Sequence, residues 1–194
     1  MKLYVPILSL LLTVTLNAQS YKVKAGAIGI PLFQSGAGMA NISFEIYNKK
    51  ANKSFQLTTS ISAGAVAADA PGTTRKWITL ERIFYTGAPD VKRKFFYTFF
   101  LEAGSRNISS GYVDFSPDSI LNQKKAFEIN PGAGIGINFK IKKKFGIDFC
   151  AGPKLIIASH KDKYYNSLSK QYFTVNYNDT RAGFRFMTSL SYQF

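Results

Sequence analysis

The last 13 residues limit the possible folds of this chain more than any other feature. From Ala182 to Phe194, mainly apolar residues occupy every second position, and polar or small residues lie between them. A period of two sustained over this length predicts a β-strand. One face, with Phe184, Phe186 and Leu190, is suited to lipid, and the other face is suited to a polar interior. A terminal phenylalanine on the apolar face fits the boundary of a membrane, because the adjacent carboxylate must remain in water.

The same alternation recurs upstream and predicts further strands. The clear segments are 40–47, 55–65, 95–104, 127–139 and 145–157. Two more are irregular. In the segment of about 21–32 we expect Ile28, Ile30 and Leu32 to point outward. In the segment of about 76–86 we expect a β-bulge to turn both Glu81 and Arg82 inward.

Eight such strands predict an all-β fold, a closed antiparallel up-and-down transmembrane β-barrel. A sheet spans hydrocarbon only by closing on itself, because every backbone polar group there needs a partner. With eight strands the interior is just wide enough for side chains to fill it. An even number of strands places both ends of the chain in the periplasm.

The N-terminus has the layout of a secretory signal. Lys2 precedes an apolar run from Tyr4 to Leu16, and small residues end at Ala18. The run is too short for a membrane-spanning helix, so we interpret residues 1–18 as a signal peptide and residues 19–194 as one barrel domain. The single cysteine, Cys150, excludes an intrachain disulfide.

The net charge of +14 suggests an acidic partner. Export and the absence of a nucleic-acid-binding motif disfavour nucleic acid and favour an anionic membrane surface. The Lys-rich segments 49–53, 92–94 and 140–144 are predicted to be periplasmic turns. The longer polar segments 105–124 and 158–179 are predicted to be external loops, since outer-membrane barrels have short turns on one side and long loops on the other.

The ending Tyr192-Gln193-Phe194 resembles the C-terminal targeting signal of bacterial outer-membrane barrels. With a chain this short, the whole pattern is similar to the eight-stranded family of the OmpA membrane domain and OmpX. This resemblance implies a cell outer membrane location in a Gram-negative bacterium, with lipid and lipopolysaccharide as surroundings. It also implies that the barrel-assembly machinery reads Phe194 and Tyr192 during biogenesis.

The proposed inward faces carry charges, which must pair because an unpaired buried charge is very unfavourable. Counted from the periplasmic ends, four of them fall within one layer of the barrel. We expect a network in which Glu102 and Glu128 pair with Lys154 and Arg185. A filled interior of this kind argues against a wide, porin-like channel.

No catalytic or cofactor motif is evident, and no cofactor or metal is predicted. The glycines of residues 132–136 lack the spacing of a dinucleotide loop and are interpreted as small inward residues of a strand. His160, the single histidine, lies beside Ser159 and near Asp162, but sequence proximity does not make a catalytic triad. The leading interpretation is therefore that the protein is not an enzyme. An outer-membrane lipid-modifying enzyme is one alternative.

The segment 158–179 mixes aromatic residues with lysines. Its aromatics include Tyr164, Tyr165, Tyr172 and Phe173. They form either a loop that binds glycans, lipopolysaccharide or protein, or the edge of an aromatic girdle. The favoured function is an integral outer-membrane barrel with an architectural or surface-interaction role. A soluble, secreted, lipocalin-like barrel is the remaining alternative, and it requires an apolar interior.

Overall fold

A computed structural model describes residues 20–28, 39–48, 52–63, 73–87, 91–113 and 119–194. These residues form one closed barrel in which each strand pairs with the next and the last pairs with the first, always antiparallel. The predicted fold is confirmed. The strands are β1 Ser20–Ile28, β2 Met39–Asn48, β3 Lys53–Ala63, β4 Thr73–Tyr85, β5 Arg93–Val113, β6 Ser119–Lys140, β7 Phe145–Asn166 and β8 Gln171–Gln193. Across the described ranges, no helix is long and apolar enough to cross a membrane.

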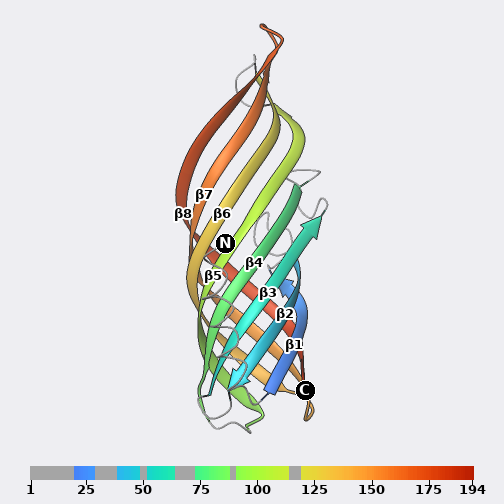
Figure 1. Cartoon of the computed structure of the whole chain (residues 1–194), viewed down its shortest axis with the longest axis vertical. Helices are drawn as coiled ribbons and strands as arrows, with labels where there is room; N and C mark the ends of the chain where they lie inside the picture. The colour runs from blue at the N-terminus through green and yellow to red at the C-terminus, as the bar shows by residue number, and fades with distance from the viewer. Residues whose placement is uncertain (1–19, 29–38, 49–51, 64–72, 88–90, 114–118) are drawn as a thin grey trace, which may run out of the picture.

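The strands fall into two length classes. Strands β1–β4 have between 9 and 13 residues, whereas β5–β8 have between 21 and 23. The four long strands continue past the others as a curved sheet (Figure 1). The prediction of long loops at 105–124 and 158–179 was therefore wrong. Both faces of these strand segments carry polar residues, so they lack the alternation by which the others were found.

Barrel closure is short compared with the other pairings. Among the described residues, β1 and β8 pair from Lys22 opposite Gln193 to Ile28 opposite Met187. In contrast, β7 and β8 pair along their whole length, from Phe145 opposite Tyr192 to Asn166 opposite Gln171.

The fourth strand accommodates the adjacent charges of Glu81 and Arg82 without the predicted β-bulge, so that prediction was wrong. The register of β4 with both neighbours is continuous. Glu81 points inward and is buried, whereas Arg82 is exposed on the outer face, 5.8 Å from the ring centroid of Phe84. Arg82 lies near the end of its strand, where a long side chain can carry its charge to the edge of the membrane.

The first strand holds two interior charges that its composition did not reveal. Lys22 and Lys24 are buried inside the barrel while Tyr21 and Val23 are exposed, so the even-numbered positions in the described part of β1 face inward. The register behind the prediction that Ile28, Ile30 and Leu32 point outward was therefore wrong in this part of the strand. Ile30 and Leu32, which were expected to point outward, lie outside the described residues, as do residues 1–19 and the side chain of Ile28. Lys94, predicted in a turn, belongs to β5 and is also buried.

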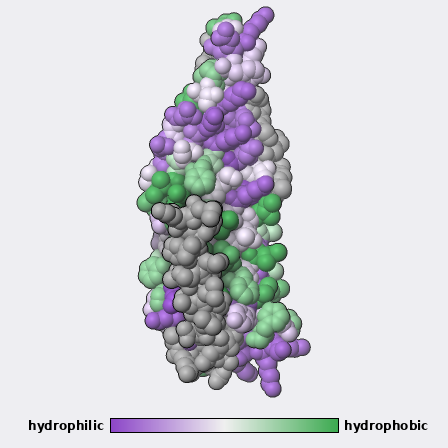
Figure 2. Space-filling view, in the orientation of Figure 1, coloured by the Kyte–Doolittle hydropathy of each residue, from purple (hydrophilic) through white to green (hydrophobic). Residues whose placement is uncertain are grey.

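One cluster of buried apolar residues lies in the lower part of the interior. It consists of Tyr47, Ile83, Tyr85, Phe96, Cys150 and Met187. The remaining interior is mainly polar, with Phe100, Ala126 and Ala158 also buried there, and the outer face between the strand ends is apolar, as the alternation predicted. Figure 2 shows hydrophobic residues along the lower part of the molecule and hydrophilic residues over the upper extension.

Candidate functional site in the barrel interior

The floor of the barrel is made of two tyrosines and the cations that contact them. The rings of Tyr47 and Tyr85 lie edge to face, 5.3 Å apart between centroids. The Nζ of Lys22 lies within 4.9 Å of both ring centroids, and the Tyr85 hydroxyl donates to Glu45 over 2.7 Å. Asn52 closes the floor from the turn side by donating to the Tyr85 carbonyl over 2.7 Å.

A second layer surrounds Lys24. Its Nζ lies 2.7 Å from a carboxylate oxygen of Glu45 and 2.9 Å from one of Asp148. All three side chains are shielded from solvent. Asn138 donates a hydrogen bond to Asp148 from the neighbouring strand. The layer thus joins β1, β2, β6 and β7 across the barrel.

The third layer surrounds Arg185, which is fully buried. One guanidinium nitrogen lies 3.0 Å from Glu81, and Nε lies 3.3 Å from Glu102. The guanidinium also lies over the ring of Phe100, 4.3 Å from its centroid. Lys154 completes the group with its Nζ 2.7 Å from Glu102. The structure therefore brings together Glu102, Lys154 and Arg185, three of the four residues expected in one layer. It adds Glu81 from β4, the strand in which a bulge was wrongly predicted.

Glu128 does not join this group, contrary to the expected pairing. It lies opposite Gly104 on β5 and Ala158 on β7, closer to the outer end of the barrel. Its carboxylate is 3.5 Å from Arg106 and 3.9 Å from Arg181. The prediction allowed for a shift of about a residue or two between neighbouring strands from tilt and shear, and this allowance was not enough to give the height of Glu128 correctly.

The outermost layer contains His160. Its Nε2 lies 3.0 Å from Asp179, and its ring stacks on that of Tyr177 with centroids 4.6 Å apart. With Nε2 as the donor, this hydrogen bond holds the pKa of Asp179 below its ordinary value. Asp162 accepts instead from the Tyr177 hydroxyl over 3.1 Å. Ser159 is exposed on the opposite face of β7, so the structure does not assemble it with His160 and Asp162 as a catalytic triad.

The aromatic residues of segment 158–179 form the tip of the β7–β8 hairpin. Tyr164 stacks on Phe173 with centroids 5.3 Å apart, and Tyr165 contacts Tyr172 at 5.1 Å. Adjacent strand positions face opposite ways, so these two pairs lie on opposite faces of the hairpin. They do not form a single binding patch.

The proposed targeting residues lie together at the lower end of the outer face. The rings of Tyr192 and Phe194 are 4.9 Å apart, and Phe145 lies 4.9 Å from Tyr192. The backbone N–H of Phe194 donates to the carbonyl of Tyr21 over 3.0 Å, while its ring is 67% exposed. The C-terminal ring is thus held in place by the backbone and remains accessible.

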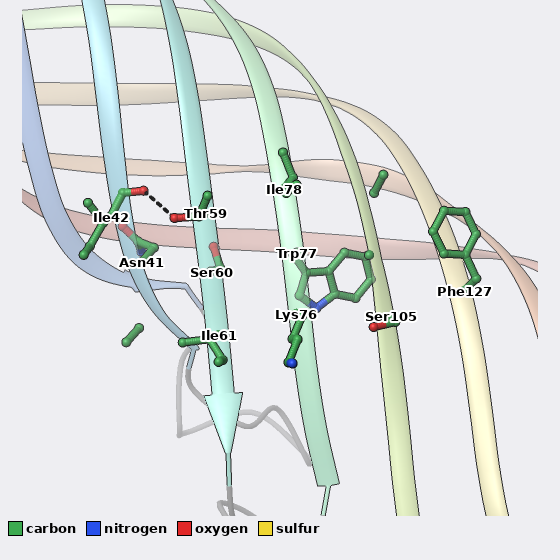
Figure 3. A pocket seen from close by; sticks show the side chains of 13 residues that line it. Asn41, Ile42, Thr59, Ser60, Ile61, Lys76, Trp77, Ile78, Ser105 and Phe127 are labelled. Carbon is green, nitrogen blue, oxygen red and sulfur yellow. Dashed lines mark hydrogen bonds between the residues drawn. The ribbon is translucent and has the colours of Figure 1, made fainter. Parts of the chain in front are cut away.

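No metal centre is evident among the described residues, since no group of three His, Cys, Asp or Glu side chains is suitably placed there. A groove of about 680 Å³ lies on the outer wall across β2–β6 (Figure 3). Outward-facing Ile42, Ile61, Ile78 and Phe127 contribute to its lining. Because these residues face away from the interior, the groove is separate from the charged layers.

Several solved outer-membrane structures share this architecture. A major outer membrane protein of Thermus thermophilus matches with a TM-score of 0.57 and 10% identity, over 90% of this chain and 98% of that one. The N-terminal β-barrel domain of Pseudomonas aeruginosa OprF matches with a TM-score of 0.50 and 12% identity, over 91% and 98%. Neisserial surface protein A matches with a TM-score of 0.50 and 13% identity, over 90% and 95%.

This chain has the fold of an eight-stranded outer-membrane β-barrel. At these identities the likeness concerns the fold alone. No protein-family model and no curated protein sequence matches the chain. Within this outer-membrane barrel fold, the polar interior rules out a lipocalin-like barrel, which requires an apolar cavity.

Proposed function

We propose that this protein is an integral outer-membrane protein with a closed, non-conducting barrel and an external sheet that serves surface interactions. The supporting observation is the inverted distribution of polarity. Ile135 and Phe184 on the outer wall are 74% and 58% exposed, whereas Glu45 and Asp148 inside are fully buried. Soluble monomers rarely expose continuous apolar surface on this scale.

The apolar belt has the dimensions of a bilayer. On β7 the outward residues from Phe145 to Ile157 are apolar, and on β8 those from Ala182 to Phe194 are mainly apolar. Thirteen residues at about 3.3 Å each give about 43 Å of strand, which at a tilt of about 45° spans about 30 Å. Beyond Ile157 and Ala182, the outward positions are mostly polar, with Ser159, Lys161, Lys163 and Thr180 among them. This part of the sheet then lies outside the membrane.

The interior supports the non-conducting part of the proposal. The layers around Lys24 and Arg185 cross the barrel and are buried. An ion would have to break these paired charges to pass, and each broken pair leaves an uncompensated buried charge. The proposed surroundings are membrane lipid and lipopolysaccharide, and the accessible Phe194 is proposed as the signal for the barrel-assembly machinery.

The experiment is fractionation of cells that express the protein, followed by electrophoresis. We expect the protein in the outer-membrane fraction, extractable only with detergent, with a gel mobility that changes on boiling. The purified protein should give no steady conductance in planar bilayers. Recovery in the soluble periplasmic fraction would contradict membrane integration, and regular single-channel steps would contradict the closed interior.

A further inference from the structure

Two arginines face each other at the outer mouth of the barrel. Arg75 on β4 is the direct register partner of Arg106 on β5. Both alternate with outward residues, Lys76 and Ser105, and therefore point to the interior side. Like charges directly opposite each other across an antiparallel ladder are destabilising. The pairing thus requires negative charge nearby.

The negative charge that the described residues supply here is small. Arg106 and Arg181 approach the same oxygen of Glu128, at 3.5 and 3.9 Å. Arg181 also lies 3.8 Å from Asp179, whose other oxygen contacts His160. Three guanidinium groups therefore face two carboxylates, and the distances are long for charge-assisted hydrogen bonds, which are typically about 2.7–2.9 Å.

Buried donors without a hydrogen bond also outnumber such acceptors at this point, where Glu128 Oε1 is the acceptor of the cluster that lacks one. Three buried nitrogens, Arg75 Nε, Arg106 Nε and Trp77 Nε1, have no acceptor among the residues that the structure describes. Trp77 lies two positions from Arg75 on the same face of β4. Its indole extends toward β5 (Figure 3), where Gly104 leaves room for it, since a Cβ there would lie 2.8 Å from Trp77 Cδ2. Buried polar groups in folded proteins are nearly always paired.

We propose that Arg75, Trp77 and Arg106 form an oxyanion-binding site for the phosphate group of a soluble molecule that enters from outside the cell. Guanidinium groups bind such anions through paired N–H donors. Three separate donors match the three or four oxygens of a phosphate better than the two of a carboxylate. The site faces the interior, so the barrel wall separates it from the lipid headgroups around the belt.

Trp77 is the single tryptophan of the chain and reports directly on the site. We would titrate the folded protein in a nonionic detergent with inorganic phosphate at constant ionic strength and follow its fluorescence. The expected result is a saturable change, with acetate at least tenfold weaker. The double variant Arg75→Gln/Arg106→Gln should lose at least tenfold in affinity. Lys76→Gln, which removes one positive charge next to Arg75 but on the outer face, should bind like the wild type.

A second variant tests whether the guanidinium group itself is needed, and a lipid phosphate tests whether the ligand is soluble. Arg75→Lys retains the charge without the guanidinium fork and should also bind phosphate more weakly. Micelles containing phosphatidylglycerol should produce no change in fluorescence that depends on the two arginines. The site is refuted if the wild type shows no saturable response, or if both arginine variants respond like the wild type. A response restricted to the lipid would refute a soluble ligand. None of these results depends on whether the protein reaches the outer membrane.

Discussion

The ring of Phe96 on β5 lies over Gly136, the residue directly opposite on β6. A Cβ on Gly136 would lie 2.2 Å from Cζ of that ring. Phe100 has the same relationship with Gly132, where a Cβ would lie 2.4 Å from the ring. The inward glycines of β6 are therefore the surface on which two aromatic rings of β5 rest, and the ring of Phe100 in turn supports Arg185.

Replacing Gly136 with alanine should destabilise the barrel by about 1–3 kcal/mol, because the methyl group overpacks against Phe96 and the carbonyl of Phe149. Gly134→Ala is the matched control on the same face of the same strand. Its nearest neighbour would be 3.0 Å away, so the loss should be much smaller. Urea unfolding in detergent micelles measures both. Equal losses for the two variants would contradict the packing described here.

The Arg185 layer predicts strong coupling with Glu81 and none with Glu128. Arg185→Met should cost about 3–5 kcal/mol, because it leaves Glu81 buried without its cation. Adding Glu81→Gln should cost less than the sum of the two single changes. The double variant Arg185→Met/Glu128→Gln should be additive to within about 0.5 kcal/mol. Unfolding free energies from the two cycles test this, and coupling to Glu128 instead would contradict the layer assignment.

Cysteine labelling should locate the edge of the membrane along β8. In a Cys150→Ala background, Leu168→Cys and Asn176→Cys should react with an impermeant thiol reagent on intact cells. Phe184→Cys, within the apolar belt, and Lys142→Cys, in the turn before β7, should not react. Labelling of Lys142→Cys from outside would reverse the proposed topology.

Deleting Phe194 should reduce the amount of protein in the outer membrane far more than its stability. Removal of a largely exposed ring alters folding free energy by a few kcal/mol at most. Phe95→Ala is the matched control, since that ring is 64% exposed on the same outer wall. Immunoblots of outer-membrane fractions should show a large loss for the deletion alone. Normal levels of the deletion variant in the outer membrane would contradict the interpretation of Phe194 as a targeting signal.

The external end of the sheet should lose stability in acid. The hydrogen bond from His160 holds the pKa of Asp179 below its ordinary value, so the carboxylate stabilises the folded state above that value. The contribution is lost as the pH falls through the lowered pKa, below about pH 4. The wild type should therefore lose more of its melting temperature between pH 6 and pH 3 than Asp179→Asn does. Identical losses would show that the contact does not contribute.

The sequence predicted the part of the fold that carries the apolar belt, because apolar residues alternate strictly with inward residues on this part of the outer wall. Segments such as 145–157 and 182–194 were identified for this reason. The external half of the long strands has no such alternation, and it was taken for loops. Lys22 and Lys24 were missed because a Gly- and Ala-rich strand offers few apolar residues to mark its outer face.

The interior network was only partly predictable. The face of each strand was mostly clear, so Glu102, Lys154 and Arg185 were correctly assigned to the interior. Their position along the barrel axis was not predicted correctly in every case. This position depends on the register between neighbouring strands, and the alternation within one strand does not contain that information. The proposed anion site of Arg75, Trp77 and Arg106 depends on the same kind of information, since Arg75 and Arg106 lie opposite each other only in the observed register of β4 and β5.

The short seam between β1 and β8 has a consequence for the order of assembly. In the part of the chain that the structure describes, the seam contains seven register pairs, which join residues such as Lys22 and Gln193 from opposite ends of the chain. In contrast, β7 and β8 are joined by a tight turn at 167–170 and pair over their whole length. Contacts between distant residues require the largest loss of chain entropy before they form. The hairpin of β7 and β8 is therefore expected to form early, and the barrel is expected to close last, when β1 pairs with β8.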